Sequence, residues 1–414
     1  MPKKKQIVFF CTTTPYVMIY KIAKEFRKRG YETVLITISQ RDKWDVNWYQ
    51  DGFDKIICSN FQIFKPTPKN LFNMFKRTHY LINSFYEMKK LTPYAVFIIA
   101  GPTYLAALAM KFFKNYPRIY FPYDIVSHFY SSSKSALEGG VKMYQIKTER
   151  FCFENAEGIF HKGAPDELKH LDKENMLGAP LKTTHLKISF QPYCSDENII
   201  YLNKNKSSKN KKSLHFVHVG GLLSNDENSK IYRNFFRELI NKKIHIHLYQ
   251  KTQHLSKEED VGNLKIAFGS LLNSKYFHME FALPPNELNS AISKYDFGMW
   301  IPYLDNLTES NDLRFQMGNK ISNYFEAGLP IIYPPRCSFI EKVTGRYGLG
   351  FPIDMTNLGE VDNFINQIKK FTQKELNVKI NLAQKDFNIK KQFPRLEKFI
   401  EKVVEKKNYT NLYK

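Results

Sequence analysis

Residues 317–335 read MGNKISNYFEAGLPIIYPP and combine a turn, a short helix and a strand. Gly318 and Asn319 are typical of the turn that precedes a helix, so Lys320 falls in the first helical turn. Gly328 ends the helix, and the apolar run after it is typical of a strand buried on both faces. A helix that leads directly into such a strand is the repeating unit of a parallel α/β fold.

The same alternation of apolar strands and amphipathic helices extends over both halves of the chain. We expect strands at 7–11, 33–38, 55–58, 94–99, 118–121 and 158–161, and again at 214–219, 244–249, 264–268, 297–301 and 330–333. Parallel strands are connected by helices that cover both faces of the sheet. The sequence therefore predicts an α/β protein with two Rossmann-like, doubly wound parallel-sheet domains that face a cleft.

A polar segment separates the two halves. Residues 201–213, YLNKNKSSKNKKS, contain almost no apolar side chains and are typical of a linker. A lysine-rich surface loop that touches nucleic acid is the alternative interpretation. We predict a first domain at 1–200, the linker at 201–213, a second domain at 214–385 and a basic helical tail at 386–414.

The charge of the chain favours anionic partners. Its 414 residues include 62 Lys and Arg against 40 Asp and Glu, a net charge of +22. A field of this sign attracts nucleic acid, acidic lipid or phosphorylated small molecules. The five cysteines form no CxxC pair, which argues against a disulfide framework and favours buried, reduced thiols. No signal-peptide core follows the N-terminus, and Gly101 and Pro102 interrupt the longest apolar run, so we expect a cytoplasmic protein.

Two groups in the second half are suited to a phosphorylated ligand. The first turn of the helix exposes N–H groups that attract phosphate, and Lys320 adds a full charge. Asn323 and Glu326 follow on the same side of the helix and can reach sugar hydroxyls. Gly220 and Gly221 follow a strand, where they let the backbone approach an anion and offer N–H donors. The alternative for the helix is that it only packs on the sheet. The alternative for Gly220 and Gly221 is a plain tight turn.

These segments resemble the donor-binding signature of the GT-B-fold glycosyltransferases, in particular the retaining family-4-like enzymes. The resemblance is carried by 319–332, by the Gly-rich loop at 218–222, and by 276–301 and 149–163. It implies that the second domain binds a nucleotide-sugar donor and that the first binds the acceptor. It also implies that the turn at Gly318 and Asn319 begins the helix that holds the diphosphate.

The chain departs from the family pattern at two points. The family's paired glutamates, eight positions apart, correspond to Phe315 and Asn323. We therefore expect Glu326, or less strongly Asn323, to bind the ribose. Gly221 stands where the family has an arginine that contacts the diphosphate. The nearest candidates to supply that charge are Arg314, Lys320 and Lys251.

The first half offers polar residues where its strands end. Thr12, Thr13 and Thr14 occupy the first strand-to-helix turn, on the acceptor side, and the lack of a GxGxxG motif there argues against a nicotinamide enzyme. Asp124 and His128 follow a buried strand, and Asp124 corresponds to the aspartate of the family's His-Asp pair. An inverting mechanism would use one of them as the general base, whereas in a retaining mechanism the donor phosphate accepts the proton. The alternative for Asp124 is a turn or helix-cap residue, and the alternative for His128 is an ordinary surface histidine.

The histidines give little indication of a metal centre. None of the eleven belongs to an HExxH motif. His215 and His218 lie on one predicted strand, and His245 and His247 lie on the next, where their spacing puts both on one face. A zinc site is the alternative to core packing. We expect no protein-bound metal and no cofactor other than the nucleotide-sugar substrate.

We predict a metal-independent, retaining glycosyltransferase that acts on a glycan, a lipid-linked or a protein-linked acceptor in cell-surface glycan biosynthesis. The alternatives are a GT-B-like nucleotide-sugar epimerase, a phosphorylase, and a basic nucleic-acid-binding protein. Nucleic acid ranks below the others because the sequence contains no recognition module. Residues 64–90 interleave aromatic and basic side chains, which fits docking on anionic lipid at the inner face of the cell membrane. A solvated helical face is the alternative for that stretch.

Overall fold

The chain forms two compact units. Unit 1 comprises residues 1–191 and 392–414, and unit 2 comprises residues 192–391. These limits differ from the predicted ones at 200 and 385, because the chain enters unit 2 before the polar segment and returns to unit 1 at its end. The computed structural model describes residues 4–12, 17–37, 51–58, 83–101, 104–122, 125, 137, 141–169, 186–191, 194–200, 206–207, 213–220, 226–250, 268–281, 283–301, 312–315 and 317–412.

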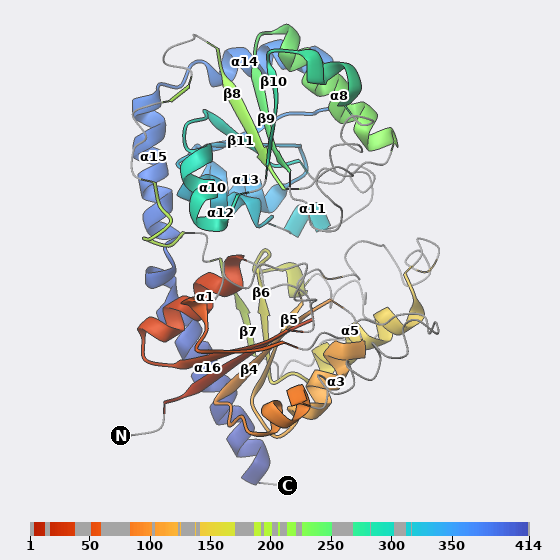
Figure 1. Ribbon diagram of the computed structural model, residues 1–414, viewed down its shortest axis with the longest axis vertical. Coiled ribbons are helices and arrows are strands. Elements are labelled where there is room, and N and C mark those ends of the chain that lie inside the picture. The colour runs from red at the N-terminus through yellow and green to blue at the C-terminus, as the bar shows by residue number, and fades with distance from the viewer. Residues whose placement is uncertain are drawn as a thin grey trace. The chain divides into compact units, whose positions relative to one another are not determined.

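Unit 1 is built on a seven-stranded parallel sheet with the order β3-β2-β1-β4-β5-β6-β7 (Figure 1). Its strands are β1 (Gln6–Cys11), β2 (Glu32–Thr37), β3 (Lys55–Cys58), β4 (Ala95–Ala100), β5 (Arg118–Pro122), β6 (Gly158–His161) and β7 (Leu186–Ser189). Every residue of β1 is buried, as expected for a strand that has helices on both faces. The six strands predicted for this half are confirmed, and β7 is an additional one.

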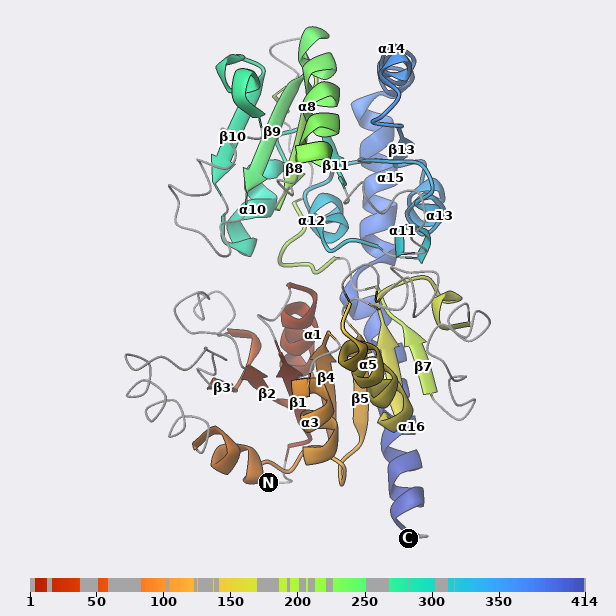
Figure 2. The same ribbon diagram turned by 90° about the vertical axis from the view of Figure 1, so that its right-hand side faces the viewer.

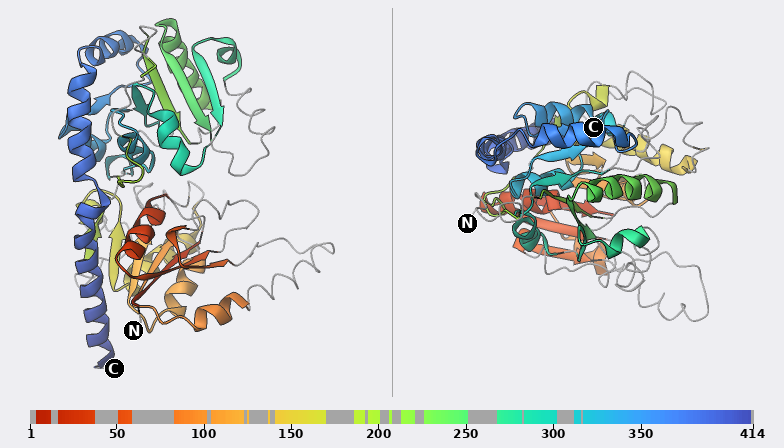
Figure 3. Two further views of the ribbon diagram at one scale, coloured as in Figure 1. Left: turned by 60° about the vertical axis from the view of Figure 1, so that its left-hand side comes forward. Right: turned by 90° about the horizontal axis from the view of Figure 1, so that it is seen from above.

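Helices α1 (Val17–Lys28) and α16 (Ile389–Leu412) cover one face of this sheet. Phe26 on α1 packs against Phe97 of the sheet and against Phe393 on α16, with ring centroids 6.4 and 4.6 Å apart. Further along α16, Lys407 Nζ donates to Glu157 Oε1 at 2.8 Å. From residue 392 onward the predicted tail is therefore part of the core of unit 1 (Figure 3).

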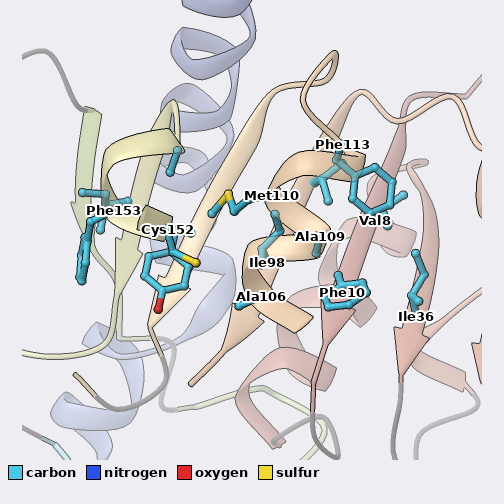
Figure 4. Close-up of a cluster of buried hydrophobic side chains, with 14 of the residues drawn as sticks. Val8, Phe10, Ile36, Ile98, Ala106, Ala109, Met110, Phe113, Cys152 and Phe153 are labelled. Carbon is cyan, nitrogen blue, oxygen red and sulfur yellow. The ribbon is translucent and has the colours of Figure 1, made fainter. Parts of the chain in front are cut away.

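Helices α3 (Tyr104–Phe112) and α5 (Met143–Asn155) cover the opposite face. Ala106 and Met110 on α3 share a buried cluster with Val8 and Ile98 of the sheet, and Cys152 joins them from α5 (Figure 4). The small residues of α3 let this helix approach the strands closely, which gives the dense packing typical of a protein core.

Unit 2 is built on a six-stranded parallel sheet with the order β10-β9-β8-β11-β12-β13 (Figure 2). Its strands are β8 (His215–Val219), β9 (His245–Gln250), β10 (Phe277–Phe281), β11 (Phe297–Met299), β12 (Ile331–Tyr333) and β13 (Gly350–Pro352). The strand that follows β9 in the described part of unit 2 is β10, which was not predicted. Of the strand predicted at 264–268, only the last residue is described. Phe268 directly precedes the short helix η5 (Gly269–Asn273), and 264–267 lie outside the described residues.

Helices cover both faces of this sheet as well. They are α8 (Asp226–Asn241), α10 (Pro285–Ile292), α11 (Asp312–Phe315), α12 (Lys320–Glu326), α13 (Ser338–Gly345), η7 (Leu358–Glu360), α14 (Val361–Ile368) and α15 (Gln373–Asp386). Phe236 on α8 packs against Phe277 on one face, at a centroid distance of 6.1 Å. Tyr324 on α12 packs against Gly298 on the other. Among the described helices, none has the length and apolar character needed to span a bilayer.

Part of the polar segment predicted as a linker packs into unit 2. The Lys206 side chain is only 5% exposed, and its Nζ donates to the backbone oxygen of Tyr295 at 2.6 Å. The next residue, Ser207, donates its N–H to the oxygen of Lys294 at 2.8 Å. Burial lowers the pKa of Lys206 to about 8. These two residues therefore hold the segment against unit 2.

Each sheet reverses its winding direction at one point. In unit 1 the reversal lies between β1 and β4, and in unit 2 it lies between β8 and β11. The connections from these neighbouring strands leave on opposite faces, which opens a crevice at the carboxyl ends of the strands. Ligands of open α/β sheets bind at such points, so both reversals are candidate sites. Together the two parallel, doubly wound sheets confirm the predicted fold class.

Candidate functional site

The described part of unit 2 places a lysine at its reversal point. Gly220 follows β8 directly, and the strand beside it, β11, ends at Met299. Lys320 is the first residue of α12, and its side chain extends to Gly220. A Cβ at Gly220 would lie 3.0 Å from Lys320 Cε, and the φ of Gly220 is +91°. Its backbone conformation therefore favours glycine at position 220, and a side chain there would crowd the end of the Lys320 side chain.

Gly220 contributes space and not a hydrogen bond. Its N–H donates to the backbone oxygen of Tyr249 at 2.8 Å, so this group is already used within the sheet. The prediction that Gly220 offers an N–H donor to a ligand is therefore wrong. Its lack of a side chain keeps the end of β8 open beside the Lys320 ammonium.

His218 fixes the position of the Lys320 ammonium. Lys320 Nζ lies 3.1 Å from His218 Nε2, and His218 Nδ1 lies 3.1 Å from the backbone oxygen of Met299. An ammonium only donates and a carbonyl only accepts. The imidazole is therefore neutral, with its proton on Nδ1, and accepts from Lys320 through Nε2. Sequence reasoning did not single out His218 for this role, although it stands directly before the glycines.

The Lys320 cation has no anionic partner among the described residues. None of their carboxylates lies within 4 Å of its Nζ, and burial lowers the pKa of Lys320 to about 8. Desolvation of an unpaired cation favours its neutral form, and a bound anion would restore the charged form. The site therefore presents a positive charge that lacks its counter-ion.

Tyr324 locks α12 onto the sheet and so fixes Lys320. Its hydroxyl donates to the Met299 oxygen at 2.6 Å and accepts from the Val219 N–H at 3.3 Å. One side chain thus joins the ends of β8 and β11. Its ring lies against Gly298, where any side chain would collide with it. On the neighbouring turn, Gly318 is similarly required because the indole of Trp300 fills the space of a Cβ.

Glu326 and Asn323 form a buried polar network at the other end of α12. Glu326 Oε1 accepts from the Ser195 N–H at 2.8 Å, and its Oε2 accepts from Asn289 Nδ2 at 2.9 Å. Asn289 Oδ1 in turn accepts from Asn323 Nδ2 at 2.9 Å. Glu326 is fully buried, and protein groups already contact both of its oxygens. Its expected role in binding ribose stays a prediction, as does that of Asn323.

The structure describes some of the remaining predicted site residues and not others. Arg314 on α11 is exposed, with its guanidinium over the ring of Phe315, and Asn319 is half-buried in the turn before α12. Thr12 directly follows β1 at the reversal point of unit 1, where its N–H donates to the oxygen of Ile99 at 3.2 Å. The other predicted site residues lie outside the described residues: Thr13, Thr14, Asp124, His128, Gly221 and Lys251. Their roles stay predictions.

Comparisons with known proteins agree with this architecture. No protein-family model and no curated protein sequence matches the chain. Among solved structures, it is similar over 99% of its length to all of Anabaena HepE in complex with UDP-glucose, at 13% identity and a TM-score of 0.60. Sucrose-phosphate synthase from Thermosynechococcus elongatus matches at 10% identity, 99% coverage of both chains and a TM-score of 0.63.

A third similar structure is the UDP complex of MnaA from S. aureus. It matches at 10% identity and a TM-score of 0.52, over 92% of this chain and 91% of the other. At such identities the similarity concerns the fold. The two parallel sheets of the chain and its full-length similarity to glycosyltransferase structures indicate the same fold. The chain therefore has the GT-B fold, with one Rossmann-like unit in each half.

Proposed function

We propose that this protein is a glycosyltransferase that uses a nucleotide-sugar, whose diphosphate binds beside Lys320 and Gly220. The observation that carries the proposal is the Lys320 cation, which lies at the reversal point of unit 2 with no carboxylate partner among the described residues. A diphosphate supplies the missing counter-charge. The complexes of similar structures with UDP-glucose and UDP support this choice of ligand.

The proposed mechanism uses Lys320 to stabilise the leaving group. When the bond between the sugar and the diphosphate breaks, negative charge develops on the departing phosphate oxygens. An ammonium held in place by His218 meets that charge without reorganisation, which is the most effective form of electrostatic catalysis. Lys320 can supply this stabilisation without a metal ion. In a retaining reaction the same phosphate accepts the proton of the acceptor hydroxyl.

We propose that the acceptor is a glycan, a lipid-linked or a protein-linked molecule in cell-surface glycan synthesis.

A panel of donors tests the proposed function. We expect sugars linked to one of UDP, GDP, ADP or CMP to raise the melting temperature of the full chain, because a ligand that binds only the folded state stabilises it. At 100 times its Kd the gain is about 2.7 kcal/mol. If no nucleotide-sugar at millimolar concentration moves the melting temperature, the proposal is contradicted.

The product distinguishes transfer from epimerisation, the alternative supported by the similarity to the structure of a putative UDP-N-acetylglucosamine 2-epimerase from Listeria monocytogenes. A glycosyltransferase should release nucleoside diphosphate in proportion to the acceptor supplied. An epimerase should convert the donor without an acceptor and release no stoichiometric diphosphate. Chromatography of the nucleotide products with and without acceptor separates the two outcomes.

The pH dependence of binding should report the charge of Lys320. With a pKa of about 8 in the free protein, the side chain is charged below pH 8 and becomes neutral above it. Phosphate groups titrate near pH 6, so the nucleotide itself stays ionised above pH 7. We expect affinity for a nucleoside diphosphate to fall about twofold from pH 7 to 8 and then by up to about tenfold per pH unit. Calorimetry should show proton uptake above pH 8, and constant affinity up to pH 9.5 would contradict this role.

Unit 1 supports a further proposal, association with an anionic membrane surface. Tyr104 on α3 and Tyr144 on α5 stack at 4.5 Å although they are 61% and 39% exposed. Leu108 and Met143 are exposed on the same two helices, and Lys111 and Lys147 are exposed beside them. Aromatic and apolar side chains enter the lipid interface, while lysines contact acidic headgroups. Of the stretch predicted for this role, 64–82 lie outside the described residues, and Phe85 and Tyr86 are exposed.

Vesicle sedimentation tests this membrane surface. We expect the wild-type chain to pellet with vesicles that contain phosphatidylglycerol and to stay in solution with purely phosphatidylcholine vesicles. The double substitution Tyr104→Ser/Leu108→Ser should weaken binding by about tenfold, given the apolar area removed. Leu382→Ser, at an equally exposed leucine on α15, is the control and should bind as wild type. Equal binding of all three proteins would argue against this surface.

A further inference from the structure

Four histidines lie together on three neighbouring strands of unit 2. His215 on β8 pairs with His245 on β9, and His247 on β9 pairs with His278 on β10. Residues two apart share a face, so all four imidazoles project on one side of the sheet. The opposite side carries Phe277, which packs under α8. The histidine cluster lies toward the amino ends of the strands, whereas Gly220 follows the carboxyl end of β8.

The rings of the histidine cluster are stacked and joined through their nitrogens. The ring centroids of His215 and His245 are 4.2 Å apart, those of His247 and His278 are 4.3 Å apart, and the ring planes in each pair are nearly parallel. His215 Nδ1 is 3.0 Å from His247 Nε2, and His245 Nδ1 is 2.8 Å from His278 Nε2. Each such contact needs one nitrogen that carries a proton and one that carries a lone pair. The accepting ring of each pair is therefore a neutral imidazole.

The surroundings of His247 favour its uncharged form. Burial and the neighbouring histidines lower the pKa of His247 to about 2, and Lys294 adds to this effect. On its other side His247 stacks on the ring of Tyr295 at 4.1 Å. His247 Nδ1 is buried and makes no hydrogen bond, and the Glu280 carboxylate is 3.8 Å away. A buried ring nitrogen without a hydrogen bond is a ready metal ligand, because metals bind imidazole in its neutral form.

We propose that His215, His245 and His247 form a binding site for a divalent transition-metal ion of the zinc class. One nitrogen of each ring lies within 4.8 Å of the others. Tetrahedral zinc with bonds of 2.0–2.1 Å separates its ligand nitrogens by about 3.3 Å. Because the lone pairs of an imidazole lie in the plane of its ring, metal binding also requires the stacked rings of His215 and His245 to turn until their nitrogens converge on the ion. Imidazole ligands without carboxylates or thiolates favour zinc, copper, nickel or cobalt over magnesium and calcium.

His278 completes the arrangement as a positioning residue. Its Nε2 lies 2.8 Å from His245 Nδ1 and can hold that nitrogen while the other nitrogen of His245 binds the ion. The ion would join β8 to β9, and through His278 it would extend to β10, which ends the sheet. Its role is therefore to stabilise this side of unit 2. The site is independent of the proposed donor site and departs from the expectation that the protein binds no metal.

Cobalt and zinc titrations test the metal site on the full chain, purified without a histidine tag and stripped with a chelator. We expect one Co²⁺ per chain by elemental analysis, visible d–d absorption typical of nitrogen ligands, and displacement of Co²⁺ by Zn²⁺. Zn²⁺ should also raise the melting temperature, as any ligand specific to the folded state does. The absence of stoichiometric binding at 100 µM metal would overturn the proposal.

Substitutions assign the site to these side chains. His247→Phe keeps the stack on Tyr295 but removes both nitrogens, and it should weaken Co²⁺ binding by at least about 100-fold. His215→Asn should have a similar effect. Tyr276→Phe is the control, because Tyr276 contacts the His245 ring at 4.9 Å and its ring is retained. Lys320→Met should bind Co²⁺ as wild type whether or not the donor proposal holds. Unchanged binding in a folded His247→Phe protein would place the metal elsewhere and contradict the proposal.

Discussion

The substitution Lys320→Met is expected to weaken the binding of a nucleoside diphosphate by about 10- to 150-fold. A hydrogen bond to a charged group contributes about 1.5–3 kcal/mol, and Met retains the length of the side chain without its charge. The Lys320 ammonium is also the cation at this site with no carboxylate partner among the described residues, so no neighbouring ion pair has to be broken. Isothermal titration calorimetry at pH 7 measures the effect directly.

Two controls accompany this measurement. Lys342→Met removes an exposed lysine of unit 2 on α13 and should bind the nucleotide as wild type. The affinity of Lys320→Met should also lose the fall above pH 8 that we expect of the wild type. Affinity within twofold of wild type in the Lys320 variant would show that the diphosphate binds elsewhere.

The substitution Glu326→Ala is expected to lower the free energy of unfolding of unit 2 by about 2–4 kcal/mol. Without the carboxylate, the Ser195 N–H loses its acceptor inside the protein, and the Asn289 amide keeps only a long contact of 3.4 Å to the backbone oxygen of Asn198. Each unsatisfied buried donor costs about 1–3 kcal/mol, partly offset when water enters the space that the side chain leaves. Denaturation in urea, followed by circular dichroism, gives the difference in stability.

Glu326→Gln is the matched variant for this network. Gln keeps one oxygen for Ser195, and its new amide would face the Asn289 amide. Rotation of the Asn289 and Asn323 amides by half a turn restores the hydrogen bonds with donors and acceptors exchanged. We therefore expect a loss of only about 1 kcal/mol. A variant Glu326→Ala as stable as wild type, with weakened nucleotide binding, would instead support the ribose role predicted from sequence.

The strands that the sequence predicted correctly are those with uniform apolar character. β1 and β4 are short runs of apolar residues, many of them β-branched or aromatic, as is typical of the interior of a parallel sheet. β7, LKIS, and β13, GFP, were missed because they are short and only partly buried. β10, FHMEF, alternates apolar and polar residues because one face of it meets the histidine cluster, so its composition resembled a surface segment.

The candidate site was predictable where its residues are adjacent in sequence. Gly318, Asn319 and Lys320 form one turn, and their position before a helix follows from local propensity. The contact of Lys320 with His218 joins residues 102 positions apart, and no local pattern reveals it. Glu326 looked available for a ligand because its spacing puts it on the same side of α12 as Lys320 and Asn323. Ser195, from the first residues of unit 2, occupies that side and accounts for its burial.

The central claim is that a nucleoside diphosphate binds at the carboxyl end of β8, with its phosphates held by Lys320. The most direct test is a crystal structure of the full chain with the nucleoside diphosphate selected by the donor panel. We predict a phosphate oxygen about 2.7–3.2 Å from Lys320 Nζ and adjacent to Gly220. A diphosphate bound elsewhere, with Lys320 still donating only to His218, would contradict the account.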